Sequence, residues 1–295
     1  MKFSAPAKIN LGLYITDKRA DGYHELASIF LPVGLCDTLE VEIDNSANSP
    51  NVGTITITTK GPFASACGDP KKNTVYKAYE AIKQATGITQ SFKVCIEKNI
   101  PSQAGLGGGS SDAGAFIGAV NQILNLSLKP NELEVIGAKV GADVPFFIKK
   151  SPTFVEGIGE KLTTFELLRD YWVVIVKPLA GLDTAMVYGN LTLSLTLKSI
   201  NAKRREHLRS IAFQGLKEAG KLKELSNDLE VPSVRLLPEI LEIKRFLEGQ
   251  KPISCMMSGS GSAVFAIFDK DVSEVKEAEN KNWFFCKTKV LRGSV

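Results

Sequence analysis

The order of apolar and polar positions near the start of the chain is typical of β-strands. Residues 7–16 alternate apolar and polar side chains, as a strand with one buried face does. Three further segments have strand character: 26–33, 38–44 and 53–59. Asp21-Gly22 is a turn signal after the first strand. The chain is therefore predicted to begin with β-structure that is largely antiparallel.

The next hundred residues alternate between helical and extended patterns. Residues 73–86 have helical spacing and stop at Gly87, and residues 92–97 form a short strand. After a glycine-rich stretch, a second helix carries an apolar stripe of Phe116, Val120, Ile123 and Leu124. Pro130 suits the first turn of a third helix, which runs to about Val140. Residues 146–148 are predicted to start a strand.

The second half mixes the two patterns again. A strand is predicted at 171–177, helices at 203–220 and 233–248, and two strands at 252–257 and 263–268. A chain of 295 residues is expected to hold two domains, at about 100–200 residues each. The pattern weakens after residue 155, so we expect one domain over 1–155 and another over 156–295. The predicted fold class is α+β in both.

Charge and cysteine content exclude several classes of protein. The chain has 36 basic and 32 acidic residues, and this small excess gives little support to nucleic acid as a partner. A basic patch around Lys203, Arg204, Arg205 and Arg209 is interpreted as the solvated face of a helix. The five cysteines include no C-x-x-C pair, and only two histidines are present, so neither a zinc site nor a disulfide framework is expected. No signal peptide or membrane span is recognised, and we expect a soluble cytoplasmic protein.

The glycine-rich stretch between Pro101 and Asp112 carries the strongest chemical signal. Four glycines occupy five positions just before a helix: Gly105, Gly107, Gly108 and Gly109. Glycine lets backbone N–H groups converge on a ligand, and the following helix adds its unpaired N–H groups, so the stretch predicts a phosphate site. Ser110, Ser111 or Asp112 is expected to cap that helix.

Three common nucleotide-binding patterns do not fit this stretch. A P-loop needs a lysine after its last glycine, and here Ser110-Ser111 follows. The dinucleotide fingerprint fails because Ser110 occupies its last glycine position. The H-R-D and D-F-G segments of protein kinases are missing.

Several motifs together give a more specific interpretation. They are Pro6-Ala-Lys-Ile-Asn-Leu-Gly12, the glycine stretch, Gly141-Ala-Asp143 and Ser258-Gly-Ser-Gly-Ser262. This set of segments resembles the GHMP kinase superfamily, whose three motifs recur in that order. The resemblance extends across nearly the whole chain. The resemblance implies a fold of two α+β domains, with the active site in the cleft between them. Arg19-Ala-Asp-Gly-Tyr-His-Glu-Leu26 and Ser226-Asn-Asp228 narrow the resemblance to members that phosphorylate the 2-hydroxyl of 4-diphosphocytidyl-2-C-methyl-D-erythritol, in non-mevalonate isoprenoid biosynthesis.

The resemblance also implies roles for individual residues. Asp143 is the candidate base that takes the proton of the accepting alcohol, and Lys8 is its cationic partner. ATP, carried as its magnesium complex, is expected to bind along the glycine stretch: Pro101, Ser102, Gln103, Ala104, Gly105, Leu106, Gly107, Gly108, Gly109, Ser110 and Ser111. Superfamily members commonly have Met-Gly where this chain has Ser102-Gln103.

The acceptor is expected to bind a separate group of residues. Tyr23 would stack on the cytosine, His24 would bond its polar edge, and Tyr188 would supply a second aromatic ring. Other expected contacts are Asn10, Asp143, Asp183, Thr184, Gly259 and Gly261. No metal site made of protein side chains is expected. The predicted partners are the cytidine diphosphate-linked polyol and ATP, with no nucleic acid or membrane, and the protein is expected to be a monomer or a homodimer.

Two other interpretations remain open. A GHMP-type kinase with a mevalonate-like or homoserine-like acceptor would keep the fold, although a stacking aromatic beside a histidine suits a nucleobase better. A non-catalytic nucleotide sensor would keep the phosphate site, but it would not need Lys8 and Asp143, which are both present.

Overall fold

The computed structural model describes residues 1–45, 53–67, 70–191, 198–278 and 281–293. The chain forms two compact units that are interleaved along the sequence. Unit 1 comprises residues 1–7, 35–102 and 107–150, and unit 2 comprises residues 8–34, 103–106 and 151–295. Each unit is described by itself. The expected domains, 1–155 and 156–295, stay a prediction.

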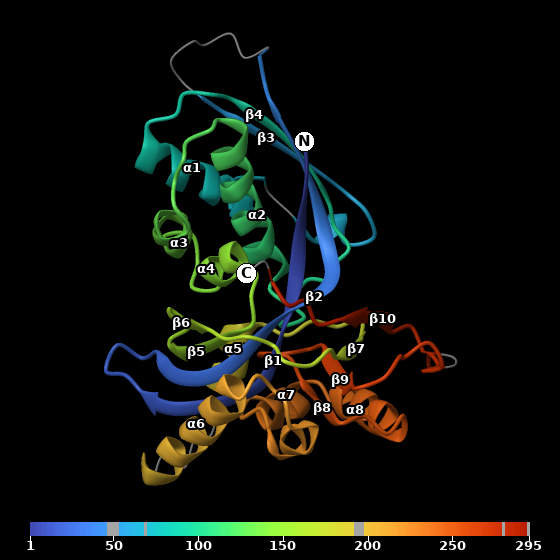
Figure 1. The fold of residues 1–295 in the computed structure, drawn as a ribbon. Helices are drawn as coiled ribbons and strands as arrows, with labels where there is room; N and C mark the ends of the chain where they lie inside the picture. Colours follow the sequence, from blue (N-terminus) through green and yellow to red (C-terminus); the bar gives the residue numbers. More distant parts are fainter. Residues whose placement is uncertain (46–52, 68–69, 192–197, 279–280, 294–295) are drawn as a thin grey trace. The chain divides into compact units, whose positions relative to one another are not determined.

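Unit 1 is built on a small sheet covered by helices (Figure 1). The second part of β2 (His24–Ile43) pairs antiparallel with β4 (Phe92–Glu97), and β3 (Ile55–Lys60) pairs parallel with β4. The first residues of β1 (Lys2–Lys18) also belong to this unit. Alternating burial along β4 leaves Phe92, Val94 and Ile96 facing the core.

The helices of unit 1 supply the other side of its core. They are α1 (Thr74–Thr86), α2 (Gly108–Ile123), α3 (Pro130–Ala138) and α4 (Val144–Lys149), with short 3₁₀ turns at Ala64–Cys67 and Pro70–Lys72. Asn73 caps α1, and Gly87 ends it in the left-handed conformation. Phe92 packs edge-on against Tyr79 of α1 and Phe116 of α2. Apolar side chains from both layers thus share one core.

Unit 2 contains a four-stranded antiparallel sheet in the order β10-β7-β9-β8. Its strands are β7 (Trp172–Lys177), β8 (Ser254–Met257), β9 (Val264–Phe268) and β10 (Phe284–Lys289). The first part of β2 pairs separately with β5 (Thr153–Gly157), which pairs with β6 (Lys161–Thr164). The central strands β7 and β9 are buried almost throughout, and they read as continuous apolar runs.

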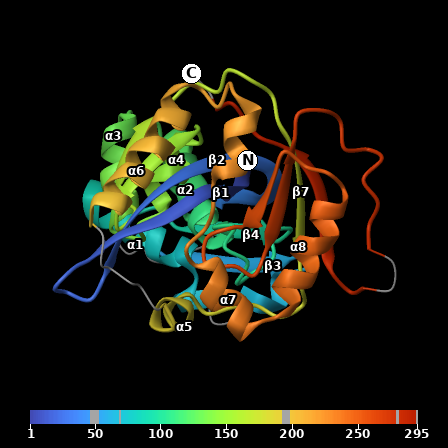
Figure 2. The same ribbon diagram turned by 90° about the horizontal axis from the view of Figure 1, so that it is seen from below.

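Helices complete unit 2. They are α5 (Thr184–Gly189), α6 (Lys198–Phe213), α7 (Glu230–Leu236) and α8 (Glu239–Gly249), with a 3₁₀ segment at Ala219–Glu224. Helix α8 lies beside β8 and β9, which are labelled in Figure 1, and Figure 2 shows the same helix from below. It buries Ile240, Ile243 and Leu247. Within the described residues, no helix is long and apolar enough to cross a membrane.

Most predicted elements are present, and two early strands merge. The segments 26–33 and 38–44 were expected to be separate, but both lie in the single strand β2. Gly34 lies between the two segments without ending the strand. A Cβ at this position would lie 2.7 Å from Thr288 Oγ1, so the glycine allows close packing rather than a turn. β5, β6 and β10 were not predicted.

One prediction of element type and two of helix bounds were wrong. Residues 146–148 are helical in α4, because Pro145 suits the first turn of a helix in which Phe146 and Phe147 are both buried. A short apolar run does not by itself distinguish a strand from a buried helix. The predicted helix 233–248 is two helices, α7 and α8, separated around Pro238. A helix was predicted over residues 203–220, and the observed helix α6 covers this range only as far as Phe213.

Candidate functional site

The glycine stretch leads directly into helix α2 in unit 1. Gly107 is the residue before the helix and has a φ of 73°, a left-handed conformation that favours glycine. The expected cap from Ser110, Ser111 or Asp112 is wrong, since no side chain caps this helix. Ser111 is instead buried and donates to the Pro6 carbonyl at 2.6 Å. The first N–H groups of α2 are therefore left for a ligand or solvent.

The middle of the same stretch, residues 103–106, belongs to unit 2 and is held there by backbone contacts. The Gln103 carbonyl accepts from the N–H of Ser262 at 3.2 Å, and the Ala104 carbonyl accepts from Ala263 at 3.2 Å. The Lys8 N–H donates to the Leu106 carbonyl at 3.0 Å. The Pro6–Gly12 motif and the Ser258–Ser262 motif are thus both joined by backbone hydrogen bonds to this part of the glycine stretch.

Gly105 makes the closest approach in this arrangement. Its φ is 71°, and a Cβ added there would lie 1.9 Å from the Ser258 carbonyl oxygen. The Ser258 hydroxyl donates to the Gly105 carbonyl at 2.9 Å. Only glycine fits this position, for both conformation and space.

Lys8 is a buried residue of unit 2, not a surface lysine. It is 4% exposed, its ammonium donates to Asn10 Oδ1, and it lies 4.7 Å from the centre of the Phe30 ring. Asn10 in turn donates to the Ser28 hydroxyl at 3.1 Å. A Cβ at Gly259 would lie 3.4 Å from Lys8 Nζ and 3.1 Å from Asn10 Oδ1. The structure therefore brings Gly259 of the Ser258–Ser262 motif beside Lys8 and Asn10 of the Pro6–Gly12 motif.

Asp143 lies in unit 1 at the start of α4. It occupies the N-cap position, but its side chain makes no capping hydrogen bond. The common structural explanation for an aspartate in such a turn, that it caps the helix, does not apply to it. The pairing of Asp143 with Lys8 stays a prediction.

Two of the expected acceptor residues of unit 2 are in ring contact. The rings of His24 and Tyr188 lie 5.4 Å apart at an angle of 31°. Tyr23 is 63% exposed, so it is not a core aromatic. Burial lowers the pKa of His24 below its usual value, and the nearby Lys18 lowers it further. His24 is thus favoured as a neutral ring that can both donate and accept a hydrogen bond.

Three other expected acceptor contacts, Thr184, Asp183 and Gly261, have structural contacts of their own. The Thr184 hydroxyl lies 2.8 Å from the Ser260 hydroxyl, which links the first residue of α5 to the Ser258–Ser262 motif. Asp183 caps α5, because its carboxylate accepts the N–H of Met186 at 3.0 Å. Gly261 has a φ of 83°, and a Cβ there would meet Met257 Sδ at 2.6 Å.

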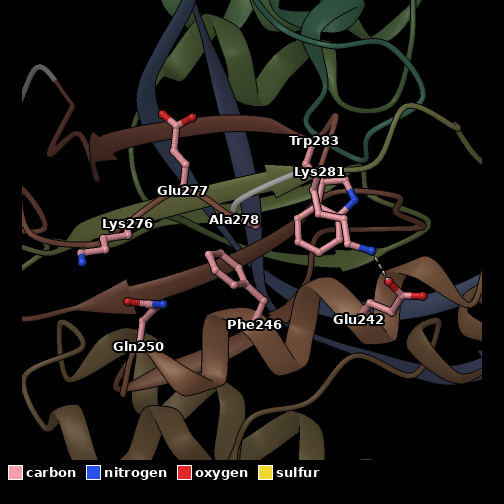
Figure 3. A pocket seen from close by; sticks show the side chains of 8 residues that line it. All are labelled: Glu242, Phe246, Gln250, Lys276, Glu277, Ala278, Lys281 and Trp283. Carbon is pink, nitrogen blue, oxygen red and sulfur yellow. Dashed lines mark hydrogen bonds and ion pairs between the residues drawn. The ribbon is translucent and has the colours of Figure 1, made fainter.

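A surface hollow in unit 2 contains none of the predicted site residues (Figure 3). Its volume is about 520 Å³, and its eight lining residues come from α8 and from the segment before β10. In Figure 3 the Lys281 ammonium reaches the Glu242 carboxylate of α8, at 2.9 Å. The hollow is open and is lined by none of the residues predicted to bind ATP or the acceptor, so we do not assign it as the site.

Comparison with known proteins identifies the family. Residues 73–151 match the family described as GHMP kinases N terminal domain, and residues 208–283 match GHMP kinases C terminal. The chain belongs to the GHMP kinase family. It is a small-molecule kinase, and the predicted α+β class is confirmed.

Curated relatives of this kinase match along nearly its whole length. A protein of Citrifermentans bemidjiense is 36% identical over 295 residues, covering 99% of both chains. A protein of Syntrophotalea carbinolica is 40% identical over 280 residues, covering 94% of this chain and 93% of its own. Both are named 4-diphosphocytidyl-2-C-methyl-D-erythritol kinase.

Solved structures of related kinases share the fold. A 4-(cytidine 5'-diphospho)-2C-methyl-D-erythritol kinase aligns with a TM-score of 0.74 and 28% identity, over 98% of this chain and 99% of its own. A homoserine kinase from Cytophaga hutchinsonii aligns with a TM-score of 0.77 at 17% identity, over 99% and 95% of the two chains. At 17% identity, the similarity to the homoserine kinase concerns the fold alone.

Sequence reasoning missed two groups in this kinase. Asn227 is buried and donates to the carbonyls of Met257 and Gly259, at 2.8 and 2.7 Å. Lys98, Asp37 and Asp112 form a buried charged cluster in unit 1. Asn227 lies in a motif already recognised, so its role could have been sought there. No pattern in the sequence indicates that Asp37 and Lys98 are in contact.

Proposed function

We propose that this kinase transfers the γ-phosphoryl group of ATP to the 2-hydroxyl of 4-diphosphocytidyl-2-C-methyl-D-erythritol. The observation that carries the proposal is the near full-length similarity, at 35–40% identity, to curated kinases named for that substrate. The pair of His24 and Tyr188 rings beside the exposed Tyr23 supports an acceptor with a nucleobase.

ATP is assigned to the glycine stretch, Pro101 to Ser111. The uncapped start of α2 offers N–H groups and the positive end of a helix dipole to the phosphates. Mg²⁺ would reach the site on the triphosphate, held mainly by phosphate oxygens and water. Within the described residues, no group of three or more His, Cys, Asp or Glu side chains is arranged to hold a metal. When bound, the ion neutralises phosphate charge.

The chemical step is assigned to Asp143 and Lys8. The acceptor oxygen forms the new bond to the γ-phosphorus, the bond to the β-phosphate oxygen breaks, and ADP leaves. The hydroxyl proton passes to the Asp143 carboxylate. Lys8, fixed by Asn10 and by the Phe30 ring, supplies the positive charge that favours the developing alkoxide.

The acceptor is assigned to residues of unit 2. Tyr23 and Tyr188 would stack on the cytosine, and neutral His24 would bond its polar edge. Asn10, Thr184 and the backbone of Gly259 and Gly261 would contact the diphosphate and polyol. We place the reaction in the cytoplasm, in a monomer or a homodimer, without nucleic acid or membrane.

The decisive experiment is incubation of the protein with ATP, Mg²⁺ and the diphosphocytidyl substrate, followed by mass and ³¹P NMR analysis. The expected product carries one added phosphoryl group as a phosphomonoester. Mevalonate and homoserine are the matched competing acceptors. Phosphorylation of either one in preference would change the substrate assignment, and ATP binding without transfer to any acceptor would indicate a nucleotide sensor.

The assigned base has its own test. Asp143→Ala is expected to lower kcat by about 10²–10⁴-fold, with nucleotide affinity nearly unchanged. Asp170→Ala, which removes an exposed aspartate paired with Arg292, is the matched control and should leave kcat unchanged. Near-normal turnover of the Asp143 variant would remove this residue from the mechanism.

A further inference from the structure

A buried cluster of three charged residues lies beneath the glycine stretch in unit 1. The Lys98 ammonium donates to Asp37 Oδ2 and, at 2.5 Å, to Asp112 Oδ2. All three side chains are at least nine-tenths buried. With every group ionised the cluster carries one net negative charge, because two carboxylates share one ammonium.

The cluster is connected to both ends of the glycine stretch. Asp37 Oδ1 accepts the backbone N–H groups of Asn99 and Ile100, at 2.6 and 2.8 Å, just before Pro101. Asp112 is the fifth residue of α2, the helix that the stretch enters. Lys98 therefore ties the chain entering the stretch to the helix leaving it.

One oxygen of the cluster has no hydrogen-bond partner. Asp112 Oδ1 is buried and unpartnered, and it is the one such side-chain atom found in the described part of the chain. Burying a charged carboxylate oxygen without a hydrogen-bond partner costs free energy, and protonation of the carboxyl lowers this cost because it removes the charge. Burial raises the pKa of Asp112 to about 7 against the opposing effect of Lys98, and Asp37 adds to the rise.

The surroundings of Asp112 are otherwise neutral. Lys98 and Asp37 are the charged groups found to act on it in the described structure. From α1, Thr74 faces the helix start with a hydroxyl bonded to the Gly109 carbonyl, and from α4, Phe147 packs against Gly114. From β1, the Pro6 carbonyl accepts from Ser111. A change of charge near the start of α2 is thus felt mainly by this cluster.

We propose that Asp112 is a positioning residue that is protonated when a polyphosphate binds at the start of α2. The inference rests on the proposed assignment of ATP to the glycine stretch. A bound triphosphate adds negative charge near a cluster that already has one excess negative charge, and protonation of Asp112 removes that excess. The neutral carboxyl keeps its bond with Lys98, so the two ends of the stretch stay joined.

The sign of the pH dependence follows from linkage. If binding takes up a proton, nucleotide affinity falls as the pH rises above the pKa of free Asp112, by at most about tenfold per pH unit for one proton. Below that pKa, Asp112 is already protonated and the dependence disappears. The nucleotide's own terminal phosphate gives up its proton below about pH 8, so it does not mimic the effect above that pH.

The test is calorimetric titration with the ATP analogue adenylyl imidodiphosphate and Mg²⁺, near pH 8, in two buffers of different protonation enthalpy. We expect a net uptake approaching one proton in the wild type and none in Asp112→Asn, which is isosteric with the protonated acid. The variant should also bind the analogue with an affinity that no longer falls between about pH 8 and 9. Asp271→Asn, which changes an exposed carboxylate bonded to the Ser273 N–H, is the matched control and should behave as wild type.

The outcomes separate the two proposals. Tight binding without proton uptake in the wild type, or with equal uptake in wild type and Asp112→Asn, would overturn the role of Asp112 alone. Absence of any nucleotide binding would overturn the proposed function as well. If Asp112→Asn does not fold, the wild type alone provides the test. Proton uptake together with an affinity that falls as the pH rises supports the proposal, and the absence of either overturns it.

Discussion

The side-chain amide of Asn227 donates to the carbonyl of Gly259 at 2.7 Å and, with its other hydrogen, to that of Met257 at 2.8 Å. The two carbonyls flank Ser258, whose hydroxyl reaches the Gly105 carbonyl. Asn227 Oδ1 also accepts the N–H of Leu229, so the side chain is fixed on both sides. Asn227, about 30 positions before this turn in the sequence, thus fixes the shape of the turn at Ser258 and Gly259.

Replacing Asn227 tests this relationship. Asn227→Asp keeps the shape but removes both N–H donors and places a carboxylate against two carbonyls. We expect unfolding free energy to fall by about 1–3 kcal/mol, measured by denaturant titration, together with a lower kcat. The same change at Asn190, an exposed amide bonded to the Met186 carbonyl, is the matched control and should cost less than about 0.5 kcal/mol. Equal losses at both positions would contradict a special role for Asn227.

Two glycines with nearly the same backbone conformation separate strain from steric conflict. Gly105 and Gly87 have φ values of 71° and 72°, but only at Gly105 would a Cβ meet other atoms, at 1.9 Å from Ser258 O. Gly87→Ala should cost about 1–2 kcal/mol of stability, the price of a left-handed alanine. Gly105→Ala should cost clearly more and abolish nucleotide binding, because the glycine stretch must move away from Ser258.

Thermal unfolding and nucleotide titration of the two alanine variants check this. A Gly105→Ala protein that unfolds at the same temperature as Gly87→Ala and still binds the analogue would show that the stretch adapts to the side chain. The contact between Gly105 and Ser258 would then not position the stretch.

The predicted elements show what local pattern can and cannot reveal. Residues 92–97 were placed correctly because alternation in a half-buried strand is a local property. Residues 146–148 were not, because a run of apolar residues suits a buried helix turn equally well, and only packing against Gly114 of α2 distinguishes the two. β10 was missed, since its pairing with β7 depends on residues about 110 positions earlier in the chain.

The site shows the same division. Lys8, Asn10 and the glycine motifs were found because they lie in short segments that resemble a family. The cluster of Lys98, Asp37 and Asp112 was not found, since its members come from three segments of the chain and meet only through the fold. Glycine at position 105 signalled conformational freedom, but its close approach to Ser258 could be known only from the structure.

Removal of the Tyr188 ring tests the acceptor side. Tyr188→Ala should raise KM for the diphosphocytidyl substrate about 5–150-fold, because stacking on a base is worth about 1–3 kcal/mol. KM for ATP should stay unchanged, which provides the control within the same variant. A loss confined to kcat, or an equal rise in both KM values, would place Tyr188 outside the acceptor site.

The lowered pKa of His24 predicts an acid effect on stability. Burial disfavours the charged ring in the folded protein, and Lys18 disfavours it further, so the unfolded chain binds the proton more readily. Stability should therefore decrease as the pH falls through the unfolded value of about 6.5 and level off below the folded value. His24→Gln, which stays neutral, should lose less stability than wild type between about pH 7 and 5. Because the ring is partly exposed, the difference should be small. Denaturant midpoints that shift equally in both proteins over this range would show that His24 is not the group responsible.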